Sequence, residues 1–77
     1  MTMPLGVVLF SSIHFALRAE KLMKKKGIPH KLIPIPRHLS SDCGVCLRIP
    51  WEKKEETLGL LAEAGVKIDG AHPLSDG

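Results

Sequence analysis

The chain has 77 residues, of which 44% are apolar and 25% are charged, and its net charge is +3. A chain of this length buries only about 60% of the surface that its unfolded form exposes, so we expect one small domain and exclude a multidomain enzyme. The longest apolar run, residues 5–10, is too short to span a bilayer, and two cysteines without a secretory signal favour a cytoplasmic protein over a disulfide-stapled secreted one.

The first predicted elements are a buried strand over residues 5–10 and an amphipathic helix over residues 13–26. Ser11 and Ser12 precede the helix, and either can cap its N-terminus. At about 100° per residue, the apolar and the basic side chains of this helix fall on two different arcs. The apolar arc contains Phe15, Ala16, Ala19, Leu22 and Met23, and the basic arc contains His14, Arg18, Lys21 and Lys25. Gly27 is the expected left-handed terminator.

The second predicted strand, residues 31–36, contains two prolines two positions apart, Pro34 and Pro36. Both prolines lack an N–H on the same side, a pattern that only an edge strand tolerates. A polar loop over residues 37–44 leads to a third strand over residues 45–49. In that strand Val45, Leu47 and Ile49 should share one face, and Cys46 and Arg48 the other.

After Pro50, a second helix is predicted over residues 51–64, with Trp51, Leu58, Leu61 and Ala62 on its core arc. Gly65 ends it, and a last strand covers residues 66–71. The order β-α-β-β-α-β is typical of an α+β, ferredoxin-like split βαβ sandwich. We expect a four-stranded antiparallel sheet of order 4-1-3-2 with two helices on one face. The domain should cover residues 1–72, and residues 73–77 should form a short flexible tail.

The charge is distributed unevenly along the chain. Residues 1–50 hold eight Lys or Arg against two acids, a net +6, whereas residues 51–77 have a net charge of −3. The basic arc of the first helix is either a solvated face or a docking surface in which Arg18, Lys21 and Lys25 contact an acidic partner. The sequence argues against nucleic acid as a partner, because the chain has no Tyr and its three other aromatic residues form no stacking motif on a strand.

The loop that carries Cys43 should lie beside the N-terminus of the first helix, because in this topology the first strand ends where the second turns into the third. Helix N-termini and nearby cations stabilise a thiolate. The candidates for stabilising an anion on Cys43 are Ser11, Ser12, His14, Arg37, Ser40, Ser41, Gly44 and Arg48, with His38 nearby. The alternative is that Ser40, Ser41, Asp42 and Gly44 are only turn residues and that Cys43 is an incidental small side chain.

Cys46 makes a C-x-x-C pair with Cys43, a spacing found in redox pairs, in halves of zinc sites and by chance. Zinc needs about four ligands, and the four histidines show no H-x₃₋₅-H pairing, so we expect no metal and no cofactor in a single chain. The spacing of Cys43 and Cys46 makes a small dithiol redox protein an alternative, with Cys46 as the resolving thiol. A third alternative is a dimeric interaction or regulatory module, for which Ile13 and Leu17 lie off the core arc.

Several short stretches, taken together, carry a family resemblance: ALRAEK, GIP, LIP, PR, SS, CG and LR. They stand at residues 16–21, 27–29, 32–34, 36–37, 40–41, 43–44 and 47–48. In this combination the chain resembles a small bacterial family of selenium/sulfur-carrier-like proteins. The resemblance implies a carrier rather than an enzyme, with sulfur or selenium held on Cys43 as a persulfide-type adduct and a donor or acceptor protein as partner. Cys46 departs from the pattern, where a small non-cysteine residue is more usual.

Overall fold

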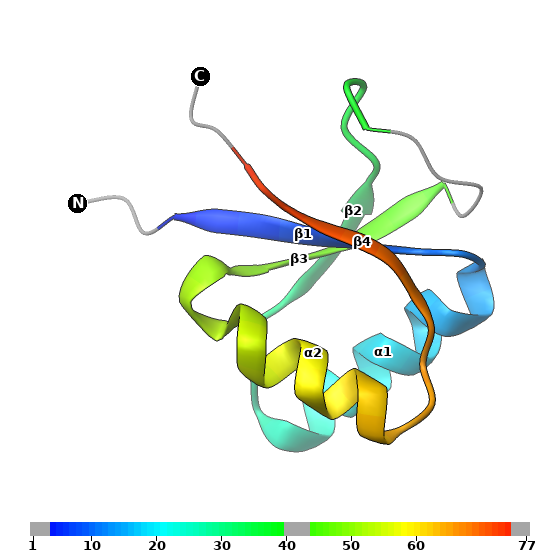
Figure 1. Ribbon diagram of the computed structural model, residues 1–77, viewed down its shortest axis with the longest axis vertical. Coiled ribbons are helices and arrows are strands. Elements are labelled where there is room, and N and C mark those ends of the chain that lie inside the picture. Colours follow the sequence, from blue (N-terminus) through cyan, green and yellow to red (C-terminus); the bar gives the residue numbers. More distant parts are fainter. Residues whose placement is uncertain (1–3, 40–43, 75–77) are drawn as a thin grey trace.

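The computed structural model describes residues 4–39 and 44–74. Its strands are β1 (Leu5–Phe10), β2 (Lys31–Pro34), β3 (Val45–Pro50) and β4 (Ile68–Pro73), and its helices are α1 (Ile13–Lys26), the 3₁₀ helix η1 (Trp51–Lys53) and α2 (Lys54–Glu63). The strands pair antiparallel in the order β2-β3-β1-β4 (Figure 1). The predicted α+β class and the order 4-1-3-2, read from the other edge of the sheet, are confirmed.

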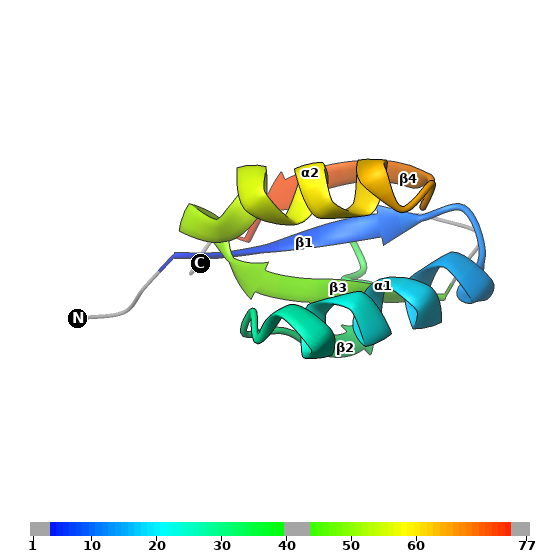
Figure 2. The same ribbon diagram turned by 90° about the horizontal axis from the view of Figure 1, so that it is seen from below.

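Both helices cover the same face of the sheet, as Figures 1 and 2 show. The main core lies between this helix face and the two helices. Its fully buried members include Phe10 of β1, Met23 of α1, Leu47 of β3 and Leu61 of α2. We call the other side of the sheet the open face.

β1 is buried on both sides because it lies between two strands and between two apolar clusters. Val8 and Phe10 belong to the core on the helix face, whereas Val7 and Leu9 form a second cluster with Cys46 on the open face. The alternation of side chains along a strand requires this division. A strand buried on both faces reads as a continuous apolar run, which explains the unbroken sequence of residues 5–10.

The helix ends follow the predicted caps. Gly27 has a φ of 72°, and the Ile28 N–H donates to the Met23 carbonyl oxygen at 3.0 Å. Gly65 repeats this arrangement with a φ of 73° and a 2.9 Å bond from Val66 N–H to Leu61 O. Each glycine takes the left-handed conformation that other residues adopt at a cost, so each ends its helix at a defined position.

The second helix differs from its prediction. It begins with the 3₁₀ turn η1, and only from Lys54 is it an α-helix. Ala62, expected in the core, is exposed, and Thr57, which was not expected there, is fully buried. A 3₁₀ helix has three residues per turn rather than 3.6, so three such residues rotate the later side chains by about 60° relative to a uniform α-helix.

Two strands also have shifted bounds. β2 ends at Pro34 rather than Pro36, because Pro36 starts a turn. The Leu39 N–H closes this turn by donating to the Pro36 carbonyl oxygen at 3.0 Å. The last strand lies at Ile68–Pro73 rather than at residues 66–71, since Val66 is used in the cap of α2. Pro73 therefore belongs to β4 and not to the predicted tail. The expected edge position of the proline-bearing strand is confirmed.

The indole of Trp51 lies against Gly6 of β1 on the helix face, so closely that a Cβ at Gly6 would overlap the ring. The backbone N–H of Trp51 donates to the Pro4 carbonyl oxygen at 2.9 Å, and Lys54 Nζ lies 5.1 Å from the centroid of the indole ring. A glycine is needed at this position because the ring occupies the space that any side chain would take.

Candidate functional site

Three strands have a terminus at the end of the sheet where β1 finishes, and we call this end the loop rim. Leu9 pairs with Cys46, and Pro34 pairs with Val45, so the end of β1, the end of β2 and the start of β3 lie at the same end of the sheet. Figure 1 shows that α1 also starts at the loop rim. The described residues thus agree with the predicted topology. Cys43, Ser40 and Ser41 themselves lie outside the described residues.

The N-terminus of α1, at the loop rim, has neither a capping side chain nor an acidic residue in its first turn. Ser12 occupies the N-cap position with extended backbone angles, φ −154° and ψ 160°, but its side chain makes no capping hydrogen bond. The first turn contains no acidic residue, and His14 in that turn is exposed. The backbone N–H groups at a helix start attract anions, and the helix dipole adds to this attraction. The predicted neighbours Ser11, Ser12 and His14 are therefore at a position that favours negative charge.

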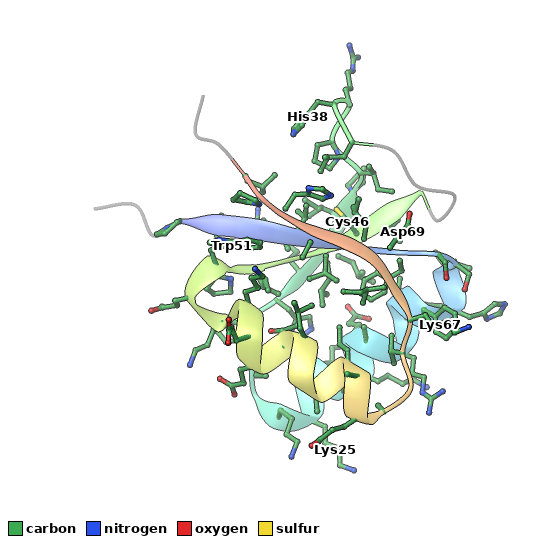
Figure 3. The ribbon with its side chains drawn as sticks, viewed as in Figure 1. Lys25, His38, Cys46, Trp51, Lys67 and Asp69 are labelled. Carbon is green, nitrogen blue, oxygen red and sulfur yellow. The ribbon has the colours of Figure 1, made fainter. Side chains whose placement is uncertain are left out.

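Arg37 and His38 are exposed in the turn that follows β2. Figure 3 shows His38 on the part of this connection that projects away from the helices. Gly44, at the other end of the connection, has a φ of 83°, and its carbonyl oxygen accepts a hydrogen bond from the Ile35 N–H at 3.4 Å. Arg37 and Gly44 therefore flank the segment that carries Cys43.

Arg48 is separated from the other predicted site residues. It pairs with Val7 of β1 and with Lys31 of β2, four residues after Gly44 along β3. At about 3.4 Å per residue, this spacing puts its Cα roughly 14 Å from that of Gly44. Arg48 and His30 line a cavity at the end of the sheet opposite the loop rim. Adjacency in the sequence was misleading here because an extended strand carries residues apart quickly.

Cys46 is 0% exposed and lies on the open face, as the strand alternation predicted. Its thiol donates to the Pro34 carbonyl oxygen, with an S···O distance of 3.9 Å. Ile33, Ile35, Leu39 and Leu74 pack over its cluster. Thiol–disulfide exchange needs access to the sulfur, so a resolving role, which stays a prediction, would require these covering residues to move.

The two helices carry opposite charge on neighbouring surfaces. Arg18, Lys21 and Lys25 of α1 are all exposed, in agreement with the predicted basic arc, and Figure 3 shows Lys25 at the end of this helix. α2 exposes acidic side chains instead, among them Glu55 and Glu56. The charge asymmetry in the sequence thus corresponds to one basic helix beside one acidic helix.

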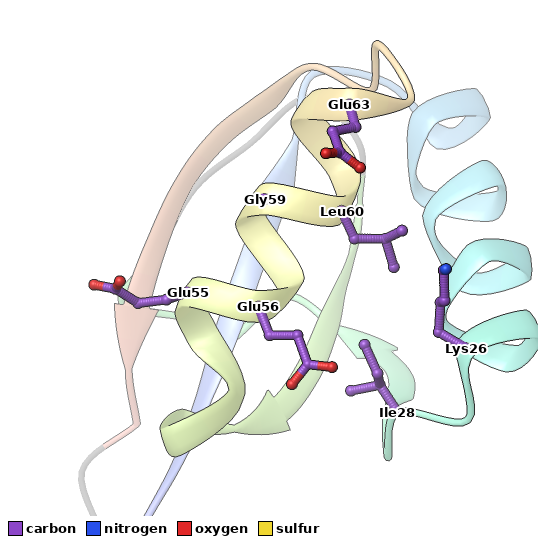
Figure 4. A pocket seen from close by; sticks show the side chains of 7 residues that line it. All are labelled: Lys26, Ile28, Glu55, Glu56, Gly59, Leu60 and Glu63. Carbon is purple, nitrogen blue, oxygen red and sulfur yellow. The ribbon is translucent and has the colours of Figure 1, made fainter.

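A groove of about 300 Å³ lies between the C-terminal end of α1 and α2 (Figure 4). Ile28 and Leu60 provide apolar lining, and the charged lining residues are Lys26, Glu55, Glu56 and Glu63. None of the predicted site residues lines this groove. Its acidic side was visible in the sequence as the glutamates of the second helix, but its partner surface on α1 depends on how the helices pack.

Residues 4–39 and 44–74 contain no group of three or more His, Cys, Asp or Glu side chains that could hold a metal ion. Within the same ranges, neither helix has the length and apolar character needed to cross a bilayer. Ile13 and Leu17 are 44% and 46% exposed, so the predicted dimer contact has accessible apolar side chains and stays a prediction.

Comparison with known protein families gives one result. A model of the family described as "Putative Se/S carrier protein-like" matches residues 5–73, a range that includes all the helices and strands. No curated protein and no solved structure gave a match. The match agrees with the resemblance carried by the short stretches between residues 16 and 48. The chain therefore belongs to the Se/S carrier protein-like family.

Proposed function

We propose that this chain carries sulfur or selenium as a persulfide-type adduct on the Sγ atom of Cys43 and that it acts as a carrier rather than as an enzyme. The observation that carries the proposal is the family match over residues 5–73. Cys43 and Gly44 are the C-G stretch of the resemblance, whereas the other thiol, Cys46, is completely buried in the cluster on the open face.

The loop rim supports this assignment electrostatically. A bound persulfide is an anion, and a helix N-terminus without acidic side chains typically stabilises a nearby negative charge by about 0.3–1 kcal/mol. Ser11, Ser12 and His14 at the start of α1, and Arg37 in the turn after β2, would add hydrogen bonds or positive charge to the adduct. Ser40 and Ser41 are included in the proposal because they lie two or three positions before Cys43 in the sequence. Arg48 takes no part in it, because the strand register puts it at the other end of the sheet.

The transfer needs no net oxidation. The Cys43 thiolate attacks the outer sulfur of a donor persulfide; the new S–S bond forms as the donor's S–S bond breaks, and the donor leaves as a thiolate that takes up the proton. The same exchange with a selenium donor forms an S–Se bond. A reducing cytoplasm would keep Cys43 available as a thiol before loading. The exposed Arg18, Lys21 and Lys25 would dock an acidic donor or acceptor protein through electrostatic complementarity.

The experiment is to load the full chain from a desulfurase-type persulfide donor and to measure its intact mass. We expect one added sulfur atom, removed by a thiol reductant, in the parent chain and in Cys46→Ser. Cys43→Ser should show no addition. Equal loading of Cys43→Ser would overturn the proposal, and loss of loading in both variants would show that the two thiols act together.

The dithiol alternative differs in its response to mild oxidation. If Cys43 and Cys46 form a redox pair, oxidation should convert the chain to a monomer that is two hydrogen atoms lighter and resists alkylation. The complete burial of Cys46 weighs against a rapid reaction of this kind. Under the carrier proposal, Cys46 should be alkylated much more slowly than Cys43 in the folded chain and at the same rate in denaturant.

A further inference from the structure

A row of basic side chains crosses the open face near the end of the sheet opposite the loop rim. Lys31 of β2 pairs with Arg48 of β3, Arg48 pairs with Val7 of β1, and Val7 pairs with His72 of β4. Directly paired residues of an antiparallel sheet point to the same face. Lys31, Arg48 and His72 therefore stand on one face in three of the four strands, next to the apolar cluster of Cys46.

This row is not neutralised within the described residues. Lys31 and Arg48 are directly opposite each other, an arrangement of like charges that destabilises a strand pair. Over residues 4–39 and 44–74, the ion pair that the structure contains joins Lys53 to Glu56 and involves neither of them. An anion held between them would relieve the repulsion.

A small cavity beside this row provides a place for such an anion. It measures about 180 Å³ and lies where β1 begins, β2 begins and β3 ends. Arg48 and His30 line it, and its other described lining residues, Leu5, Pro29, Ile49 and Pro50, are apolar. No carboxylate of the described residues lines it. The cavity is smaller than the range of about 300–1,000 Å³ that drug-sized ligands occupy, so it suits a small ion.

The ring of His30 is held in a defined tautomer. Its Nδ1 atom lies 2.8 Å from the Ile28 carbonyl oxygen, and because a carbonyl only accepts, Nδ1 must carry the proton. The neutral ring then has Nε2 as a hydrogen-bond acceptor. The guanidinium of Arg48, in contrast, presents only donors in a planar fork that matches two oxygen atoms of an oxyanion.

We propose that this cavity is a binding site for a hydrogen phosphate-type oxyanion. Arg48 donates to two of its oxygens, Lys31 contributes positive charge, and Nε2 of His30 accepts the remaining P–OH hydrogen. This division of roles predicts a preference for phosphate over sulfate, because sulfate at neutral pH has no O–H to donate. The proposal is independent of the carrier function, since it involves neither cysteine.

The test is a nuclear magnetic resonance titration of the full ¹⁵N-labelled chain with sodium phosphate or sodium sulfate at constant ionic strength and neutral pH. We expect saturable shifts centred on the amides of residues 30–31 and 48–49, with a phosphate Kd on the order of 1 mM, as suits a few charge-assisted hydrogen bonds. Sulfate should bind at least about fivefold more weakly. Shifts that do not saturate, or that spread over α1 equally, would overturn the site.

Matched variants separate this site from general attraction to a basic protein. Arg48→Met keeps a long apolar stem and should weaken phosphate about tenfold or more, whereas Arg18→Met removes the same charge from exposed α1 and should change the Kd less than about twofold. Equal weakening by both would refute the proposal. If Arg48→Met does not fold, Arg48→Lys decides instead: unchanged affinity would exclude the guanidinium fork. His30→Phe should abolish the preference for phosphate, and a retained preference would exclude the role of Nε2.

Discussion

The two faces of the sheet differ in what covers them. On the helix face, Phe10, Leu47 and Ile49 are completely buried under two regular helices. On the open face, the buried cluster consists of Val7, Leu9 and Cys46, and its cover comes from β2, the turn after it and Leu74. The helix face therefore holds most of the fold together, whereas the open face is only partly closed and carries the basic row beside the second cysteine.

The two faces of this one sheet therefore differ in role: the helix face stabilises the fold, and the open face presents side chains that can bind or react. β1 contributes to both clusters through alternate residues, so the same backbone supports a rigid core and a surface with charged and sulfur-containing side chains. Substitutions on the open face should affect binding more than stability, and those on the helix face the reverse. Adjacent residues of one strand can test this.

The largest expected effect is that of Phe10→Ala on the helix face. Removing a fully buried phenyl ring should lower the free energy of unfolding by about 3–5 kcal/mol, because the ring's burial is lost and the cavity refills only partly. Its neighbour Leu9→Ala on the open face should cost only about 2 kcal/mol, since its less regular cover can collapse. Urea unfolding measures both. Equal costs would mean that the two faces are equally well packed.

A smaller contrast is expected between two glycines. Gly6→Ala on the helix face should destabilise by about 1–3 kcal/mol, because its methyl group would overlap the Trp51 ring. At Gly70, paired with Leu9 on the open face, a Cβ would lie 3.2 Å from Nε2 of His72, which can rotate away. Gly70→Ala should therefore change stability by less than about 0.5 kcal/mol. Tryptophan fluorescence would show whether Gly6→Ala displaces the ring.

A further substitution, at Thr57, should raise stability by a modest amount. This hydroxyl is completely buried in α2 and has no hydrogen-bond partner among the described residues. Thr57→Val keeps the shape and removes the unsatisfied group, so it should raise the free energy of unfolding by about 1 kcal/mol. Thr57→Ser, which keeps the hydroxyl and loses a methyl group, is the control and should be destabilising. A loss of stability in Thr57→Val would show that the hydroxyl has an unrecognised partner.

Much of the architecture could be predicted because it depends on local sequence patterns. The apolar arc of α1, the glycines that end both helices and the alternation in β3 depend on residues within a few positions of one another. The two prolines also determined that the second strand lies at an edge, since missing N–H groups exclude it from the middle of a sheet. The family resemblance likewise rested on short stretches of sequence and was confirmed by the match over residues 5–73.

The tertiary structure decided what depends on distant neighbours. The 3₁₀ turn that rotates α2 and buries Thr57, the cover over Cys46 and the pairing of Arg48 with Lys31 arise from packing between segments far apart in the chain. Periodicity tells which face of a strand a side chain occupies, but only the register tells what stands beside it. For this reason the sequence placed Arg48 with the thiol loop, and the fold placed it in a basic row at the other end of the sheet.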